Sequence, residues 1–249
     1  MTAALTIVAF VFGLALGSFL NVVAARLPER RSIVRPRSSC PNCGYEIAWY
    51  DNVPLISYAV LRGRCRNCAE PISWRYPAVE LAAGALAAAC VAVFGLSFEA
   101  LVASFFCLAL VAISAIDAER RIIPNRIVIP AAAIVLAAQT AIHPSPEWVI
   151  AGFGASFGLF VLALAYPAGL GMGDVKLALL LGAMLGRTVT VSIFFGCLAA
   201  MVPAIVLFAR HGKAARKMAI PFGPFLALGG VVALFAGHQL LDAWLRLGH

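Results

Sequence analysis

Charged side chains are scarce in this sequence of 249 residues: Asp, Glu, Lys and Arg together make up 12%, and only 11 residues are acidic. Soluble globular domains carry roughly twice that share of charge. Hydrophobic residues account for 63% of the chain, whereas about half is usual in soluble domains. This composition excludes an ordinary water-soluble enzyme, a disordered chain and a small secreted fold held by disulfides.

Several catalytic motifs are absent as well. The sequence has no Gly-x-Ser-x-Gly elbow and no His-Glu-x-x-His pair, which argues against serine and zinc intramembrane proteases. The run Gly169-x-Gly171-x-Gly173 looks like a nucleotide-binding loop. It lacks a preceding strand and a strand–helix–strand context, so dinucleotide binding is not expected.

Long apolar runs are what the sequence does contain, and they predict about eight transmembrane helices. The first run, residues 2–25, is followed rather than preceded by basic residues, so we expect a permanent span and not a signal peptide. The others are 78–96, 98–116, 127–142, 148–168, 175–185, 188–209 and 220–241. The run 175–185 covers only about 16 Å of a hydrocarbon core about 30 Å thick. Either this helix tilts, or the Gly-rich segment before it enters the bilayer.

The basic residues predict the orientation of these spans. Eight crossings place the loop after the first span on one side of the membrane, which we call the inner side. All Lys and Arg residues except Arg187 and Arg246 would lie on this side. This inner side would include the loop cations Lys213, Arg216 and Lys217. We therefore expect the N-terminus outside. The net charge of +8 is explained more plainly by contact with anionic lipid than by nucleic acid, which is not expected as a partner.

Four of the seven cysteines form two Cys-x-x-Cys pairs, Cys40 with Cys43 and Cys65 with Cys68, in the basic loop. Two such pairs separated by a short stretch present four thiolates as a tetrahedron, which a structural Zn²⁺ site requires. Redox or incidental cysteines are the alternative, although the inner side of the membrane is reducing. The charge of the cluster could be offset by Arg37, Arg64 and Arg66.

Taken together, the runs and the cysteines predict an all-α polytopic membrane protein with a small zinc-binding domain between the first and second spans. We divide it into a first transmembrane helix at 1–25, a zinc domain at 26–77 and a transmembrane helical catalytic domain at 78–249. Three pairs of glycines predict small helix faces for close packing: Gly13 and Gly17, Gly154 and Gly158, and Gly182 and Gly186.

Away from the loops, the acids of interest in or at the ends of predicted spans are Glu80, Asp117 and Asp174. An ionisable side chain at such a depth is costly, so each is a candidate functional residue. The predicted orientation places Asp117 and Asp174 on the inner side. Two adjacent carboxylates share a proton, so one acts as a base toward water while the other donates to a carbonyl oxygen, as metal-free peptide hydrolysis requires. Gly171 and Gly173 would let an extended substrate approach Asp174.

Structural interpretations of the same acids stay open. Asp117 could pair with Arg120 or Arg121 one turn further on, and Asp174 could cap the next helix. Glu80 could be a capping or orientation-setting carboxylate. Acids within the membrane would also suit an ion-coupled transporter, although no internal repeat is visible in the sequence.

The order of these motifs resembles the bacterial type IV prepilin peptidases of the GxGD class of intramembrane aspartyl proteases. The matching segments are the paired Cys-x-x-Cys loop and residues 17–23, 74–81, 117–125, 171–177 and 220–226. The resemblance implies that Asp117 and Asp174 are the catalytic pair. It also implies cleavage of the basic leader of type IV prepilins and type II secretion pseudopilins at the cytoplasmic face of the bacterial inner membrane.

Family members with the four-cysteine loop typically also methylate the new N-terminal residue, usually Phe, with S-adenosylmethionine. The resemblance therefore implies both activities, a cytoplasmic zinc domain and a periplasmic N-terminus. Glu80, close in sequence to the zinc loop, is the one candidate for a role in methyl transfer. A prepilin protease without methyltransferase activity is the nearest alternative, and labelled methyl donor would separate the two.

Overall fold

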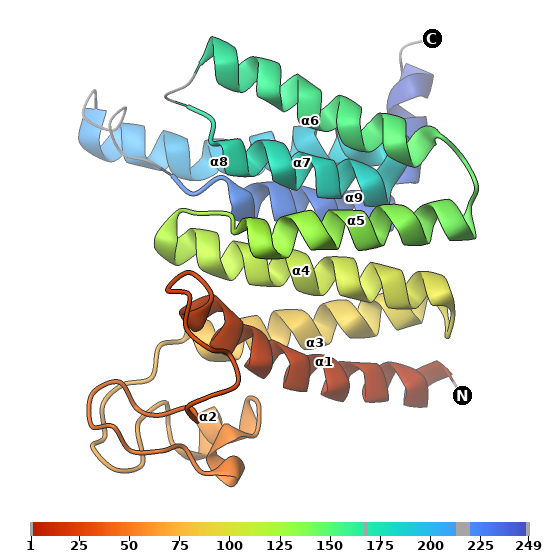
Figure 1. Ribbon diagram of the computed structural model, residues 1–249. Helices are drawn as coiled ribbons and strands as arrows, with labels where there is room; N and C mark the ends of the chain where they lie inside the picture. Colours follow the sequence, from red (N-terminus) through yellow and green to blue (C-terminus); the bar gives the residue numbers. More distant parts are fainter. Residues whose placement is uncertain (1, 167–168, 213–219, 248–249) are drawn as a thin grey trace. The chain divides into compact units, whose positions relative to one another are not determined.

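The computed structural model describes residues 2–166, 169–212 and 220–247 (Figure 1). The long helices are α1 (Thr2–Arg26), α3 (Arg75–Phe94), α4 (Phe98–Arg120), α5 (Asn125–Ile142), α6 (Glu147–Ala165), α7 (Met172–Leu185), α8 (Val189–His211) and α9 (Gly223–Leu247). Three short helices, η1 (Trp49–Asn52), α2 (Ile56–Val60) and η2 (Gly186–Thr188), lie between them. The chain divides into two compact units, Met1–Ile116 and Asp117–His249.

In the first unit, α1 and α3 pack against each other and run antiparallel. A Cβ atom at Gly13 would lie 2.8 Å from the Cα atom of Gly84, and one at Gly17 would lie 2.7 Å from the Cα atom of Glu80. The two backbones meet because these glycines have no side chain. The predicted small face of α1 is confirmed, whereas the prediction for α6 is wrong: Cβ atoms at Gly154 and Gly158 would have no neighbour within 4 Å.

The loop between α1 and α3 contains two turns of the same design. In the first, the N–H of Gly44 donates to the carbonyl of Cys40 at 2.9 Å, and the N–H of Cys40 donates to the carbonyl of Tyr45. In the second, the N–H of Ala69 donates to the carbonyl of Cys65 at 3.0 Å. The residue after each Cys-x-x-Cys has a positive φ, +72° at Gly44 and +58° at Ala69. The turns η1 and α2 connect them.

In the second unit, α7 is the central helix and packs against α5, α6 and α9 (Figure 1). It carries leucine and alanine on every side, and ten of its fourteen residues are buried. A Cβ atom at Gly182 would overlap the carbonyl group of Ala151 on α6, so these two helices touch backbone to backbone. A helix that is apolar all round belongs in the middle of a bundle.

The eight predicted spans correspond to eight helices, α1 and α3 to α9. Seven helical runs among the described residues are long and apolar enough to cross a membrane, and one of them, Met172–His211, joins α7 to α8. This run turns at Gly186, where φ is +56°. The 14 residues of α7 extend only about 21 Å, which confirms the short span. The protein is thus a multi-pass helical membrane protein.

The short helix begins at Met172 rather than at residue 175, so Gly173 and Asp174 belong to its first turn. The Gly-rich segment is therefore partly helical. Three of the cations assigned to the inner side, Lys213, Arg216 and Lys217, lie outside the described residues.

Candidate functional site

Asp117 lies in the last turn of α4 and is 5% exposed. Its Oδ2 accepts a hydrogen bond from the N–H of Gly223, the first residue of α9, at 2.9 Å. A Cβ atom at position 223 would lie 2.8 Å from this oxygen. A residue with a side chain would therefore push the carboxylate away, so glycine is needed where α9 approaches Asp117.

Asp174 lies in the first turn of α7 and is 8% exposed. Its Oδ2 accepts a hydrogen bond from the N–H of Gly171, the N-cap of α7, at 3.1 Å. The N–H of Asp174 donates in return to the carbonyl of Gly171 at 3.1 Å. The capping role considered for this acid is thus real, and a carboxylate near a helix N-terminus is favoured by the helix dipole.

Both carboxylates line one cavity of about 490 Å³, which is partly open to the surface. The other lining residues come from the segment after α4, the Gly-rich segment, the start of α7 and the segment before α9. The structure therefore brings together two predicted catalytic acids that are distant in the sequence. Two carboxylates that lie close together in one cavity disfavour a double negative charge and can share a proton.

The predicted approach glycines are in the same cavity, but one has a packing role that the sequence did not reveal. A Cβ atom at Gly173 would lie 2.9 Å from the Cβ atom of Ile123. One at Gly171 would lie 3.3 Å from Oδ2 of Asp174. Gly173 thus lets Ile123 close one wall, while Gly171 lets the chain bend around the carboxylate.

Sequence reasoning missed the pair Lys176 and Asn125, which also lines the cavity. The Nζ atom of Lys176 donates a hydrogen bond to Oδ1 of Asn125 at 2.8 Å and joins the start of α7 to the start of α5. The position of Lys176 two residues after Asp174 was the available signal. Nothing in the sequence pointed to Asn125 as its partner.

The four cysteines of the first unit form one cluster. Their Sγ atoms all lie within 4.8 Å of one another, with Cys40 to Cys68 at 3.8 Å and Cys43 to Cys65 at 4.0 Å. A tetrahedral Zn²⁺ with Zn–S bonds of about 2.3 Å places its sulfur ligands about 3.8 Å apart. The donor set and its spacing therefore fit a zinc ion.

Hydrogen bonds at Cys43 favour its thiolate, the form that binds metal. The N–H of Tyr45 and, next, the side chain of Asn67 lower the pKa of the Cys43 thiol to about 6. Nδ2 of Asn67 lies 3.6 Å from the Cys43 sulfur, and Nδ2 of Asn42 lies 3.8 Å from that of Cys68. The asparagine of each Cys-x-x-Cys thus faces a sulfur of the other pair, a role that sequence reasoning missed.

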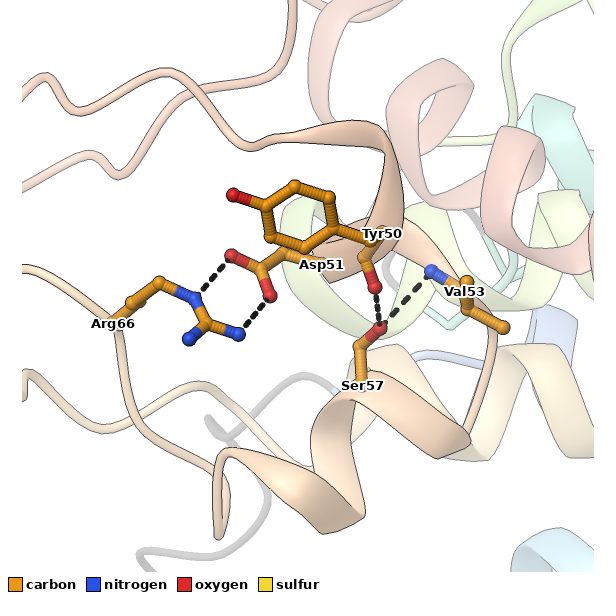
Figure 2. A network of polar contacts seen from close by, with 5 residues as sticks. All are labelled: Tyr50, Asp51, Val53, Ser57 and Arg66. Carbon is orange, nitrogen blue, oxygen red and sulfur yellow. Dashed lines mark hydrogen bonds and ion pairs between the residues drawn. The ribbon is translucent and has the colours of Figure 1, made fainter.

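Arg66, one of three arginines considered as counter-charges for the cluster, is paired with a carboxylate instead. Its Nε and one terminal nitrogen contact Oδ2 and Oδ1 of Asp51 at 2.7 and 2.6 Å (Figure 2). The hydrogen bond and the charge of Arg66 lower the pKa of Asp51 below its usual range. Arg66 also lies 5.6 Å from the ring centre of Tyr50. The second cysteine turn is thereby fixed to η1.

Glu80, on the second turn of α3, has a structural partner in the same unit. It is 8% exposed, and its Oε2 accepts the N–H of Leu55 at 2.9 Å. Leu55 is the N-cap of α2 and has a φ of +59°. Glu80 thus holds the start of α2, which is the capping role considered for it.

Comparison with known proteins connects these two sites to one family. The model of the bacterial peptidase A24 N-terminal domain matches residues 11–94, and that of the type IV leader peptidase family matches residues 104–207. A curated Burkholderia pseudomallei (strain 1026b) protein named prepilin leader peptidase/N-methyltransferase is 37% identical over 266 residues, which cover 92% of this chain and 84% of that protein.

Proteins of the same name give similar matches. That of Bacillus subtilis is 34% identical and covers 96% of this chain and 97% of its own length. That of Pseudomonas aeruginosa is 33% identical, with shares of 94% and 91%. The chain belongs to the type IV leader peptidase family. No solved structure matches it significantly.

The two family models divide the sites between them. The A24 N-terminal domain contains the cysteine cluster and Glu80, and the leader peptidase segment contains Asp117 and Asp174. Gly223, which holds the carboxylate of Asp117, lies beyond both matched segments. The complete cavity is therefore visible only in the folded chain.

Proposed function

We propose that this chain is an intramembrane aspartyl endopeptidase that removes the leader of type IV prepilins and type II secretion pseudopilins, and then methylates the new N-terminal residue. The observation that carries the proposal is the shared cavity of Asp117 and Asp174, in which a glycine N–H fixes each carboxylate. The names of the relatives support both activities.

Cleavage uses the two carboxylates in different protonation states. The ionised one takes a proton from water, and the resulting hydroxyl attacks the scissile carbonyl carbon. The protonated one donates to the carbonyl oxygen, and a proton then passes to the leaving nitrogen as the C–N bond breaks. A backbone N–H holds Oδ2 of both Asp117 and Asp174, and we assign the contact with water and substrate to Oδ1.

The cavity walls suit a junction between a polar leader and an apolar helix. Ile122, Ile123 and Phe222 supply an apolar wall, and Lys176 supplies a donor for a peptide carbonyl. Gly171 has no side chain that would block the approach of a substrate backbone to Asp174. The new N-terminal residue, usually Phe in the family that this chain resembles, would contact the apolar wall.

Methyl transfer belongs to the unit with the cysteine cluster. A structural Zn²⁺ would be held by Cys40, Cys43, Cys65 and Cys68 in the loop of residues 26–77, which is called the module here. This module has little core of its own, so the metal would supply much of its folding free energy. S-adenosylmethionine would supply the methyl group. Glu80, buried beside this module, is assigned a supporting role through Leu55 rather than direct contact with the donor.

The proposed setting is the bacterial inner membrane. Residues 1–25 form the first span with a periplasmic N-terminus, residues 26–77 the cytoplasmic zinc domain, and residues 78–249 the catalytic membrane domain. The distribution of basic residues supports this orientation. Anionic lipid is the expected surface partner of the basic loop, and nucleic acid is not expected to bind.

The experiment is leader removal from a purified prepilin, followed by transfer of labelled methyl groups. Asp117→Asn and Asp174→Asn should each lower cleavage by about 10²-fold or more, because each removes a proton-transfer group. Glu119→Gln changes an exposed acid two residues from Asp117 and should cleave like the unmodified chain. Cleavage that survives either aspartate substitution would contradict the assignment.

A further inference from the structure

The segment of residues 49–60, which contains η1 and α2 and is called here the η1–α2 segment, exposes large apolar side chains. Trp49 is 83% exposed, Ile56 63% and Val60 70%. Ile56 and Val60 are one helical turn apart and share a face of α2. Large apolar side chains that are exposed together in one short segment are typical of surfaces that bind a membrane or another protein.

A hydrogen bond fixes this segment at the level of a membrane helix. The N–H of Leu55, directly before α2, donates to Glu80 at 2.9 Å, and Glu80 lies about 7.5 Å along α3 from its first residue. With 20 residues, α3 is about 30 Å long, the thickness of the hydrocarbon core. If α3 crosses the core from its first to its last residue, the start of α2 lies within about 7.5 Å of the boundary between lipid headgroups and acyl chains. Figure 1 shows α2 beside one end of α1 and α3, with the loops of the module extending further out.

The backbone of the η1–α2 segment is prepared for a site with little water. The N–H of Val53 donates to Oγ of Ser57 at 3.0 Å, and this hydroxyl donates to the carbonyl of Tyr50 at 2.9 Å (Figure 2). The N–H of Leu55 is satisfied by Glu80. Backbone carbonyls accept the N–H groups of Ile56, Ser57 and Ala59. Backbone groups that enter lipid need such internal partners.

The charges of the segment also suit a lipid leaflet. Asp51 is its only acid, and that carboxylate is 5% exposed because Arg66 covers it with a bidentate ion pair (Figure 2). Arg62 and Arg64, directly after the segment, are exposed. The surface therefore presents apolar and positive groups, which complement acyl chains and anionic headgroups.

We propose that the η1–α2 segment is an interfacial anchor. Trp49, Ile56 and Val60 insert at the headgroup–acyl boundary of the leaflet next to the start of α3, to the depth of about 5 to 10 Å that interfacial helices reach. The anchor fixes the height of the cysteine cluster above the bilayer. An effect of the anchor on methyl transfer rests on the proposed function, whereas the lipid contact itself requires neither activity.

The depth of Trp49 is measured in a variant with Trp74, Trp148 and Trp244 changed to Phe, reconstituted in nanodiscs of phosphatidylcholine and phosphatidylglycerol. Phospholipids brominated high on the acyl chain should quench Trp49 strongly, those brominated near the chain end weakly, and aqueous iodide hardly at all. Emission quenched by iodide and untouched by bromine would overturn the proposal. Emission protected from both would show a protein cover and would overturn it equally.

A matched control places tryptophan elsewhere in the same module. Val34 is 78% exposed and lies in the loop after α1, so Val34→Trp, in the same background with Trp49→Phe, should be quenched by iodide and not by bromine. The unmodified chain offers a test without substitutions: a phospholipid with a diazirine high on its acyl chain should label residues 49–60. Absence of label there, with α1 and α3 labelled, would contradict the anchor.

The functional consequence is tested with Ile56→Ser combined with Val60→Ser. This variant should lose shallow-bromine quenching of Trp49 and methylate a smaller fraction of cleaved product, with leader cleavage unchanged. Unchanged quenching in this variant would contradict insertion of α2. Failure of the proposed function would look different, because cleavage would then be absent in every variant while Trp49 stays quenched.

Discussion

The cysteine cluster and the carboxylate cavity differ in how far along the chain their parts lie. The cluster is made of two similar turns within residues 40–68, and each turn is closed by its own backbone hydrogen bonds. The cavity needs the end of α4, the start of α7 and the segment before α9. A short-range site is therefore visible as a motif, whereas a long-range site exists only after the helices pack.

The first way to sharpen this comparison is to remove the metal, which should affect one site only. Chelation, or Cys65→Ser, should abolish most methyl transfer, because the module has little core and depends on metal for folding. Metal affinity should fall by more than the roughly 10- to 100-fold typical of lost outer contacts. Metal content, methyl transfer and leader cleavage are measured on the same samples.

Leader cleavage should stay within a few-fold of its original rate in that experiment. The control is Cys197→Ser, which changes an exposed cysteine outside the cluster and should leave metal content and both activities unchanged. Equal loss of cleavage and methyl transfer on chelation would show that the two sites are not separable.

A second test targets the long-range site at a residue that no motif revealed. Gly223→Ala places a Cβ atom 2.8 Å from Oδ2 of Asp117 and should displace the carboxylate. A displacement of about 1 Å costs roughly 10²-fold in rate. Gly154→Ala adds the same methyl group where nothing lies within 4 Å and should cleave normally. Equal rates for the two variants would remove Gly223 from the site.

The sequence predicted the helices from local composition and the four-cysteine cluster from short spacing. The pairing of Asp117 with Asp174 rested on the order of motifs that resembles the family, because spacing alone left a structural role for each acid open. It could not show that Gly223 holds Asp117, or that Asn125 holds Lys176, because these contacts depend on which helix ends meet. The prediction for Gly154 and Gly158 failed because their spacing does not say whether a neighbouring helix packs there.

A smaller effect is expected from Asn125→Ala. It removes the acceptor that holds the ammonium group of Lys176 in the cavity, and one such hydrogen bond contributes about 1 kcal/mol, or roughly fivefold. We expect KM for the prepilin to rise while kcat changes little, since Lys176 binds substrate in this account. Arg126→Ala, at the next and exposed position, is the control. A fall in kcat at constant KM would assign the pair to the chemical step instead.

The smallest effect concerns pH and the loop module. The ion pair with Arg66 lowers the pKa of Asp51, so the pair stabilises the module above the ordinary carboxyl pKa of about 4, and this contribution is lost as pH falls through the lowered value. Asp51→Asn should therefore lower the thermal midpoint modestly at neutral pH. The difference from the unmodified chain should shrink in acid. A difference that grows as pH falls would have the wrong sign for this pair.

The central claim is that Asp117 and Asp174 act as one unit in one cavity. It is tested most directly by a double-mutant cycle on leader cleavage with Asp117→Asn, Asp174→Asn and the combined variant. If the carboxylates share a proton and a water, removal of either disables both, so the combined variant should be no slower than the slower single variant. A combined loss equal to the product of the two single losses would show independent roles and would contradict the account.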